Sequence, residues 1–463
     1  MFNRHIFITG LALFAMFFGA GNLIFPVMMG INAGTSVGWA LLGFCLTGIA
    51  LPAIALVAAT SASDSNPMSI VMRLGRIPGQ GILWIIFLTT GMLYAVPRVA
   101  TVSFEIAVAP VAGVQTGKSS WQLFVYAVIF FIVVAAFSMK PGKLVDRVGA
   151  WLTPTLLVLI TLLVIAILWT LPTTHNAPSE EYANAPLAAG LVQGYFTMDA
   201  MASYVFGFII VSSLRRAGYT SRPRLFGAII ATGCVTGVLL GLVYSGLGFA
   251  GNRLANGGFE NGAQALAFAS RDLFGSLGHL IFGLIAILAC LTTAVGLFGA
   301  STPFYRLYFP KVPYSVMLLG QSLVAIGLAY MGLDAILAIV SPLSQFIYPL
   351  VICLVVVTFI DMAVPGRLFW SYRLTAGVCA SLSLGEALLS TKLEIFKGLG
   401  AYLNILPGGP IQMSWFAPTL IALLVALLID AGQGRFAKSA HVEDEYGEVV
   451  EKITQATQSD VKA

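Results

Sequence analysis

The stretch Leu11-Ala-Leu-Phe-Ala-Met-Phe-Phe-Gly-Ala-Gly-Asn-Leu-Ile-Phe-Pro26 lies inside the first apolar run of the chain, where an uninterrupted helix is expected. Glycine is conformationally free and proline lacks a backbone donor, so the helix breaks most easily at Gly19, Gly21 and Pro26. Broken backbone at membrane depth is tolerated where protein or a water-filled cavity satisfies the freed groups, as at many transporter sites. The alternative is a packing motif, in which the glycines let another helix approach.

The composition is that of a polytopic membrane protein. The 463 residues are 58% hydrophobic and 9% charged, with a mean hydropathy of +0.92, whereas a soluble domain carries roughly 25% charged residues. About twelve apolar runs have the length of a membrane span, and they are centred near Phe18, Gly48, Leu93, Ile129, Leu159, Ser203, Gly237, Ala289, Leu323, Phe346, Ala380 and Leu423. The sequence therefore predicts an all-α integral membrane bundle over residues 1–431 and a polar cytoplasmic tail over 432–463.

The basic residues predict the orientation of the bundle. With the amino terminus placed in the cytoplasm, the inner loops carry most of them: Arg4, Arg73, Arg76, Lys140, Lys143, Arg147, Arg215, Arg216, Arg222, Arg224, Arg306, Lys311, Arg367 and Arg373. The outer loops carry only Lys118, Arg253, Arg271, Lys392 and Lys397. This asymmetry follows the positive-inside rule, so both termini are expected in the cytoplasm of a cell whose inner membrane holds the protein. The net charge of +5 is thereby explained by topology, and no nucleic-acid partner is expected.

Cysteine and histidine give no sign of a disulfide framework or a metal centre. The 5 cysteines all lie in apolar runs and are expected to be buried thiols: Cys45, Cys234, Cys290, Cys353 and Cys379. The 4 histidines are scattered without metal-ligand spacing. We therefore expect no cofactor, and no obligatory protein partner is evident.

A second interrupted helix is expected at Leu191-Val-Gln-Gly-Tyr-Phe-Thr-Met-Asp-Ala-Met-Ala-Ser-Tyr-Val-Phe-Gly207. A carboxylate at Asp199, near the bilayer midplane, costs several kcal/mol unless it is paired or hydrated, so a functional role is the first hypothesis. The alternative is a structural carboxylate bonded to a neighbouring helix. The two interrupted runs are the first and the sixth, which are equivalent positions in an inverted repeat of five helices.

Three segments, in order along the chain, carry a family resemblance: Phe17-Phe-Gly-Ala-Gly-Asn-Leu-Ile-Phe-Pro26, Val96-Pro-Arg-Val-Ala-Thr-Val-Ser-Phe-Glu105 and Gly194-Tyr-Phe-Thr-Met-Asp-Ala-Met-Ala-Ser203. They resemble the signature segments of the bacterial branched-chain amino acid:cation symporters (BrnQ type), within the amino acid–polyamine–cation superfamily. The resemblance implies import of leucine, isoleucine and valine, coupled to sodium or sometimes to protons. It also implies a LeuT-like five-plus-five inverted repeat with broken helices 1 and 6, here about 6–170 and 187–360, and two extra helices, about 368–431.

The two breaks offer the groups that an amino acid zwitterion needs. Free N–H groups after Gly19, at Ala20, Gly21 and Asn22, suit the carboxylate at a positive helix end. Unwound carbonyls around Phe196, Thr197 and Asp199 suit the ammonium and a cation. By resemblance, the carbonyls of Ala15 and Phe18 and the residues Ala289, Thr292 and Thr293 would form a sodium site of hard oxygen ligands. Ordinary helix contacts of the two threonines are the alternative. Asn22 and Thr197 are candidates for a second sodium position.

One departure from the sodium-coupled pattern concerns the outer gate. Sodium-coupled neurotransmitter-type carriers place an arginine between the helix 1 asparagine and the following Phe-Pro, and this chain reads Asn22-Leu-Ile-Phe-Pro26 instead. Our hypothesis is that Arg98 supplies the gating charge, with Glu105 on the same helix face. A fixed structural link between Arg98 and Glu105, directly or through another helix, is the alternative.

Selectivity for aliphatic side chains requires a dry pocket, and its candidate lining residues are equally compatible with lipid-facing or core positions: Phe14, Phe17, Phe196, Met198 and Met201. Two other classes of protein are disfavoured. A membrane enzyme would need a catalytic constellation such as clustered His and carboxylates, and a channel would need a continuous polar pore or a repeated filter sequence. Neither pattern occurs in the sequence, so a carrier and not an enzyme is predicted.

Overall fold

The computed structural model describes residues 4–61, 67–115, 117–140, 144–173, 176–259, 261–364, 367–391, 393–409 and 412–437. Within these ranges every regular element is a helix, which confirms the all-α prediction. The predicted tail over 432–463 lies outside the described residues from position 438 onward, as do the loop residues Lys143 and Lys392.

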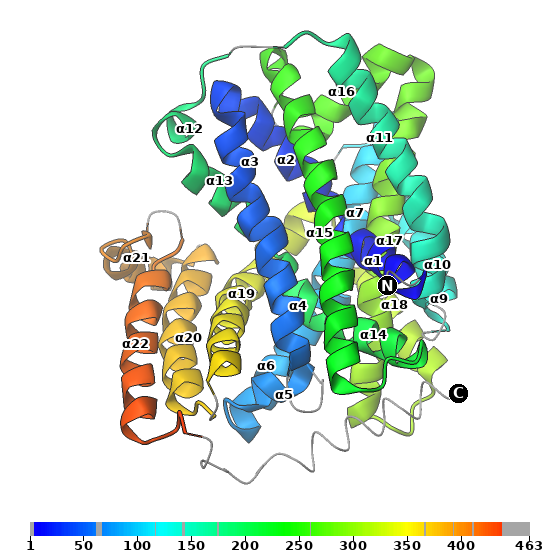
Figure 1. Ribbon diagram of the computed structural model, residues 1–463. Helices are drawn as coiled ribbons and strands as arrows, with labels where there is room; N and C mark the ends of the chain where they lie inside the picture. Colours follow the sequence, from blue (N-terminus) through cyan, green and yellow to red (C-terminus); the bar gives the residue numbers. More distant parts are fainter. Residues whose placement is uncertain are drawn as a thin grey trace.

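Each predicted apolar run falls on one helix or on consecutive helices (Figure 1). The first five runs give α1 (Arg4–Phe17) with α2 (Ala20–Ala33), α3 (Val37–Cys45) with α4 (Leu51–Ser61), α6 (Arg76–Leu88) with α7 (Ala95–Ala107), α9 (Trp121–Ser138), and α10 (Leu144–Arg147) with α11 (Thr153–Thr170). The remaining runs give α13 (Pro186–Tyr195) with α14 (Asp199–Arg216), α15 (Arg222–Arg253), α17 (Ser276–Tyr308), α18 (Tyr314–Tyr330), α19 (Leu333–Ala363), α20 (Trp370–Ser390) and α22 (Phe416–Gly432).

Short helices occupy the connections: α5 (Pro67–Met72), α8 (Ala109–Ala112), α12 (Glu180–Asn184), α16 (Gly262–Phe274) and α21 (Lys397–Leu403). By length and apolarity, 7 of the described helices are able to cross a membrane, or up to 8 if α13 and α14 count as one bent span. The helices α1, α18 and α22 are shorter and also apolar. The chain is thus a multi-pass membrane protein.

Close backbone contacts bring the broken helices against their neighbours. A Cβ atom at Gly30 would collide with the carbonyl of Gly248, so only glycine lets α2 approach α15 this closely. A Cβ atom at Gly190 would collide with the carbonyl of Ala40 in the same way, where α13 packs on α3. These contacts fix α2 beside α15 and α13 beside α3.

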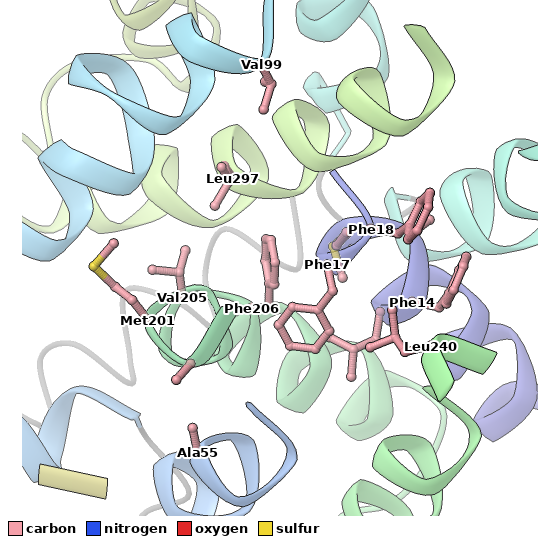
Figure 2. Packing of buried hydrophobic residues seen from close by; sticks show 14 of the residues in the cluster. Phe14, Phe17, Phe18, Ala55, Val99, Met201, Val205, Phe206, Leu240 and Leu297 are labelled. Carbon is pink, nitrogen blue, oxygen red and sulfur yellow. The ribbon is translucent and has the colours of Figure 1, made fainter. Parts of the chain in front are cut away.

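The buried core surrounds the first break. Figure 2 shows aromatic side chains of α1 meeting residues of α14, α15 and α17. Phe14 stacks on Phe18 with ring centroids 5.4 Å apart, and Phe17 lies edge-on to Phe206 at 5.5 Å. Phe14, Phe17 and Met201, which the sequence offered as pocket or core residues, are buried in this core.

The prediction that all cysteines are buried is wrong for two of them. Cys290, Cys353 and Cys379 are buried, whereas Cys45 is half-buried and Cys234 is exposed on the surface of α15. An apolar run does not imply burial within the protein, because lipid is as apolar as a protein core and solvates the outer faces of the helices.

Candidate functional site

The first break exposes the start of α2. α1 ends at Phe17 and α2 begins at Ala20, while Gly19 between them is extended (φ −98°, ψ −169°). The first backbone bond of α2 is that of the Leu23 N–H to the Gly19 carbonyl, at 3.2 Å. The N–H groups of residues 20–22 therefore precede the hydrogen-bonded part of the helix, and together with its positive end they favour an anionic group.

The second break exposes carbonyl groups. α13 ends at Tyr195 and α14 begins at Asp199, and the two halves are bent by 45°. The Thr197 hydroxyl donates to the Gly194 carbonyl at 2.8 Å and closes the turn. Within the described chain, no hydrogen bond reaches the carbonyls of Phe196 and Thr197. Such free carbonyl oxygens suit an ammonium group or a cation.

A buried side-chain cluster joins the two breaks. Asn22 Nδ2 donates to Asp199 Oδ2 at 2.6 Å and to the hydroxyl of Tyr244, on α15, also at 2.6 Å. The side chains are almost completely buried, with Asn22 3% and Asp199 5% exposed. Sequence reasoning missed Tyr244, because a single tyrosine in an apolar helix carries no signal until the glycine contacts place α15 against α2.

The oxygen atoms expected to hold sodium lie where α17 passes α1. The Thr292 hydroxyl donates to the Ala15 carbonyl at 2.8 Å and to the Ala289 carbonyl at 3.0 Å. The Thr293 hydroxyl donates to the Met16 carbonyl at 3.0 Å, so Met16 joins this group although the sequence did not single it out. Phe18 has no bond to either threonine, and its carbonyl accepts none from the described residues. These bonds also fit a plain helix contact, so the sodium assignment stays a prediction.

A cavity of ≈ 490 Å³ leads to the first break. Ala20 and Gly21 line it together with Arg98 and Glu105 of α7, and residues of α16 line it at the end that is uppermost in Figure 1. The start of α2 is thereby reached from one end of the molecule.

Arg98 and Glu105 form no direct ion pair with each other, and each has another partner. Arg98 donates to the Tyr94 hydroxyl at 3.2 Å and lies over the Tyr94 ring, whereas Glu105 accepts the Gly117 N–H at 2.8 Å. Seven residues along a helix span about 10 Å, which is too far for a direct ion pair. Both charges nevertheless line the same cavity.

Known proteins similar to this chain show its family. A family model described as "Branched-chain amino acid transport protein" matches residues 2–433. The branched-chain amino acid permease BrnQ of Corynebacterium glutamicum is 36% identical over 430 residues, covering 93% of this chain and 96% of that protein. The permease of the same name from Salmonella typhimurium is 34% identical over 446 residues, covering 95% of this chain and 99% of that protein.

Among solved structures the chain is similar to Mhp1, a transporter of the nucleobase-cation-symport-1 family. The closed conformation with bromovinylhydantoin bound gives a TM-score of 0.58 at 13% identity, covering 98% of this chain and 96% of that one. The inward-facing conformation gives 0.54 at 13% identity, covering 92% and 91%. At this identity the likeness concerns the fold alone, and it supports the LeuT-like prediction. The chain therefore belongs to the family of branched-chain amino acid transport proteins, as a membrane transporter and not an enzyme.

Proposed function

We propose that the protein imports the branched-chain amino acids leucine, isoleucine and valine by cation symport, with sodium as the coupling ion. Relatives named branched-chain amino acid permeases support the substrate class. The observation that carries the proposal is the Asn22–Asp199 bond of 2.6 Å, which holds the two breaks face to face. The N–H groups at the start of α2 on one side and the free carbonyls of the second break on the other form a cradle for a small zwitterion.

Each end of the zwitterion has its own set of groups. The carboxylate binds the N–H groups that follow Gly19, at Ala20, Gly21 and Asn22. The ammonium binds the carbonyls of Phe196 and Thr197 and is neutralised by Asp199. Backbone groups of the two breaks, together with Asp199, thereby bind both the carboxylate and the ammonium of the substrate.

The coupling ion has a candidate site beside the same break. Ala15, Ala289, Thr292 and Thr293 supply oxygen atoms around α1 and α17, with Phe18 offering a further carbonyl. Hard cations prefer such ligands. Asn22 and Thr197 are candidates for a second position. No further cofactor or obligatory protein partner is part of the proposal.

We further propose that the cavity faces outward and that Arg98 and Glu105 gate it. Both charges line the cavity above Ala20 and Gly21. Alternating access would close this side before the substrate is released inward. The basic loops then face the cytoplasm together with both termini, in the inner membrane.

Proton coupling is the second candidate, and Asp199 is the observation that favours it. A buried carboxylate bonded to Asn22 is able to carry a proton through the transport cycle. A carrier of the same fold with a different amino acid preference is a further alternative, since one methylene in an apolar pocket is worth only about 1–3 kcal/mol.

Purified protein in liposomes tests these proposals. Labelled leucine should accumulate against its gradient when an inward sodium gradient is applied, and should compete with isoleucine and valine. If accumulation needs a proton gradient instead, protons and not sodium are the coupling ion. Flux that only dissipates the leucine gradient would contradict symport.

A further inference from the structure

The second break contains an unfavourable backbone conformation. Met198, between α13 and α14, has φ 59°, in the left-handed region. In the described chain, only Gln412 shares this feature among residues other than glycine. The left-handed region is unfavourable for any residue with a Cβ atom, because this atom comes too close to the backbone, so the surrounding structure has to hold Met198 there.

α19 makes the contacts that hold this turn. The hydroxyl of Ser344 donates to the sulfur of Met198, with an oxygen–sulfur distance of 3.0 Å. Ser344 is completely buried. One helical turn further along α19, the ring of Tyr348 lies edge-on to that of Tyr195, with centroids 4.8 Å apart. α19 thus contacts the last residue before the break and the strained residue within it.

We propose that Ser344 is a positioning residue for the substrate site. Its bond to the Met198 sulfur fixes the left-handed turn, and the turn aims the carbonyls of Phe196 and Thr197 at the substrate ammonium. The Met198 side chain is flexible and unbranched, so without this anchor its backbone relaxes toward more favourable conformations. This inference rests on the proposed function of the α13–α14 break as the substrate site.

Leucine uptake by Ser344→Ala in liposomes tests the proposal. We expect KM to rise about three- to tenfold, as the loss of one positioning contact predicts, with Vmax changed less than about twofold. Ser381→Ala is the matched control, because the Ser381 hydroxyl is exposed and bonds only to the Gly377 carbonyl of its own helix. An unchanged KM in Ser344→Ala, with a fully active wild type, would overturn the proposal.

Repeating the Ser344→Ala measurement in a protein that also carries a substitution at Met198 distinguishes a positioning role of Ser344 from a packing role. Glycine adopts the left-handed region without strain, and asparagine tolerates it well, so Met198→Gly or Met198→Asn removes the need for an anchor. In either background, Ser344→Ala should leave KM unchanged. The same rise in KM with and without Met198 would mean that Ser344 acts by packing, against the proposal. A wild type that does not transport leucine would instead overturn the proposed function, and this inference with it.

Discussion

Asp199 is a buried carboxylate that the structure places at the meeting point of three helices. Asn22 of α2 donates to Asp199, and the same amide donates to Tyr244 of α15. A carboxylate this deep is costly in an apolar membrane protein unless it serves binding or is fully bonded. Its charge, more than its shape, is therefore the property to test.

Asp199→Asn keeps the size of the side chain and removes the charge. We expect cation-driven leucine uptake to fall at least about tenfold, because the ammonium loses its counter-charge, which is worth more than about 1.4 kcal/mol. Uptake across a range of pH measures this. Asp272→Asn, on the exposed face of α16, is the control. Full uptake at every pH would make Asp199 a structural residue.

Thr292 distinguishes a sodium site from a helix contact. Thr292→Val preserves the volume but removes the oxygen that faces Ala15, so the sodium concentration for half-maximal uptake should rise about tenfold, the effect of losing one hard ligand. Thr155→Val is the control, since the Thr155 hydroxyl is exposed and bonds to its own helix. An unaltered sodium dependence would leave the threonine as a packing residue.

Substitution of Arg98 tests the hypothesis that this residue gates the cavity. In Arg98→Lys the charge remains, but the planar group that contacts Tyr94 is lost, so we expect leucine uptake to fall several-fold. Initial uptake rates measure the effect. Arg271→Lys, on exposed α16, should behave as wild type. Unchanged uptake by Arg98→Lys would remove the gate hypothesis.

At the scale of elements, α20 and α22 pack together, and each carries one buried carboxylate that bonds backbone N–H groups at or just before the start of the other helix. Asp430 of α22 accepts the N–H groups of Phe369, Trp370 and Ser371 at the start of α20, at 2.9–3.2 Å. Glu386 of α20 accepts the Ser414 N–H at 2.7 Å just before α22. Asp430 therefore caps the start of α20, and Glu386 holds the segment that leads into α22, structural roles that the apolar runs did not reveal.

Removing the Asp430 cap should weaken the contact between α20 and α22. Asp430→Ala leaves N–H groups unpaired in a buried site and should cost about 2–4 kcal/mol of stability. The thermal unfolding temperature of the protein in detergent should therefore fall. Glu394→Gln is the control, because the Glu394–Lys397 pair is exposed and such pairs contribute little. An unfolding temperature equal to that of the control would contradict the capping role.

At the scale of the whole molecule, a cavity lies toward one end, and an ion pair with a hydrogen bond joins helices at the other end. The cavity beside Ala20 reaches the end at α16. At the opposite end, Arg73, which follows α5, forms an ion pair with Asp361 of α19 and donates to the Tyr372 hydroxyl at 2.9 Å. This arrangement is the one expected for the outward-facing side of the alternating-access cycle that we propose.

Cysteine labelling in right-side-out vesicles tests which way the cavity faces. Leu337→Cys, at an exposed cavity-lining position, should react with an impermeant thiol reagent from outside, and leucine with sodium should slow the reaction. Met139→Cys, exposed at the end of α9, should react only after the membrane is permeabilised. The parent protein without either substitution corrects for native thiols such as Cys234. The reverse pattern of labelling would invert the orientation.

Part of this protein is determined by sequence alone. The run of glycine, asparagine and proline between Gly19 and Pro26 marks the first break, which the structure confines to Phe18 and Gly19, whereas Gly21, Asn22 and Pro26 lie inside α2. Asp199 marks the second break, since a carboxylate is conspicuous in an apolar run. Apolar length likewise predicts the helical membrane fold.

Tertiary structure alone decided which groups meet. Tyr244 reaches Asn22, and Ser344 reaches Met198, from helices whose sequences give no local reason for the contact. Arg98 contacts Tyr94 and Glu105 accepts the Gly117 N–H, and their spacing along the helix did not reveal either partner. Local sequence sets where backbone bonding stops, whereas packing between distant helices sets which side chains face the gap.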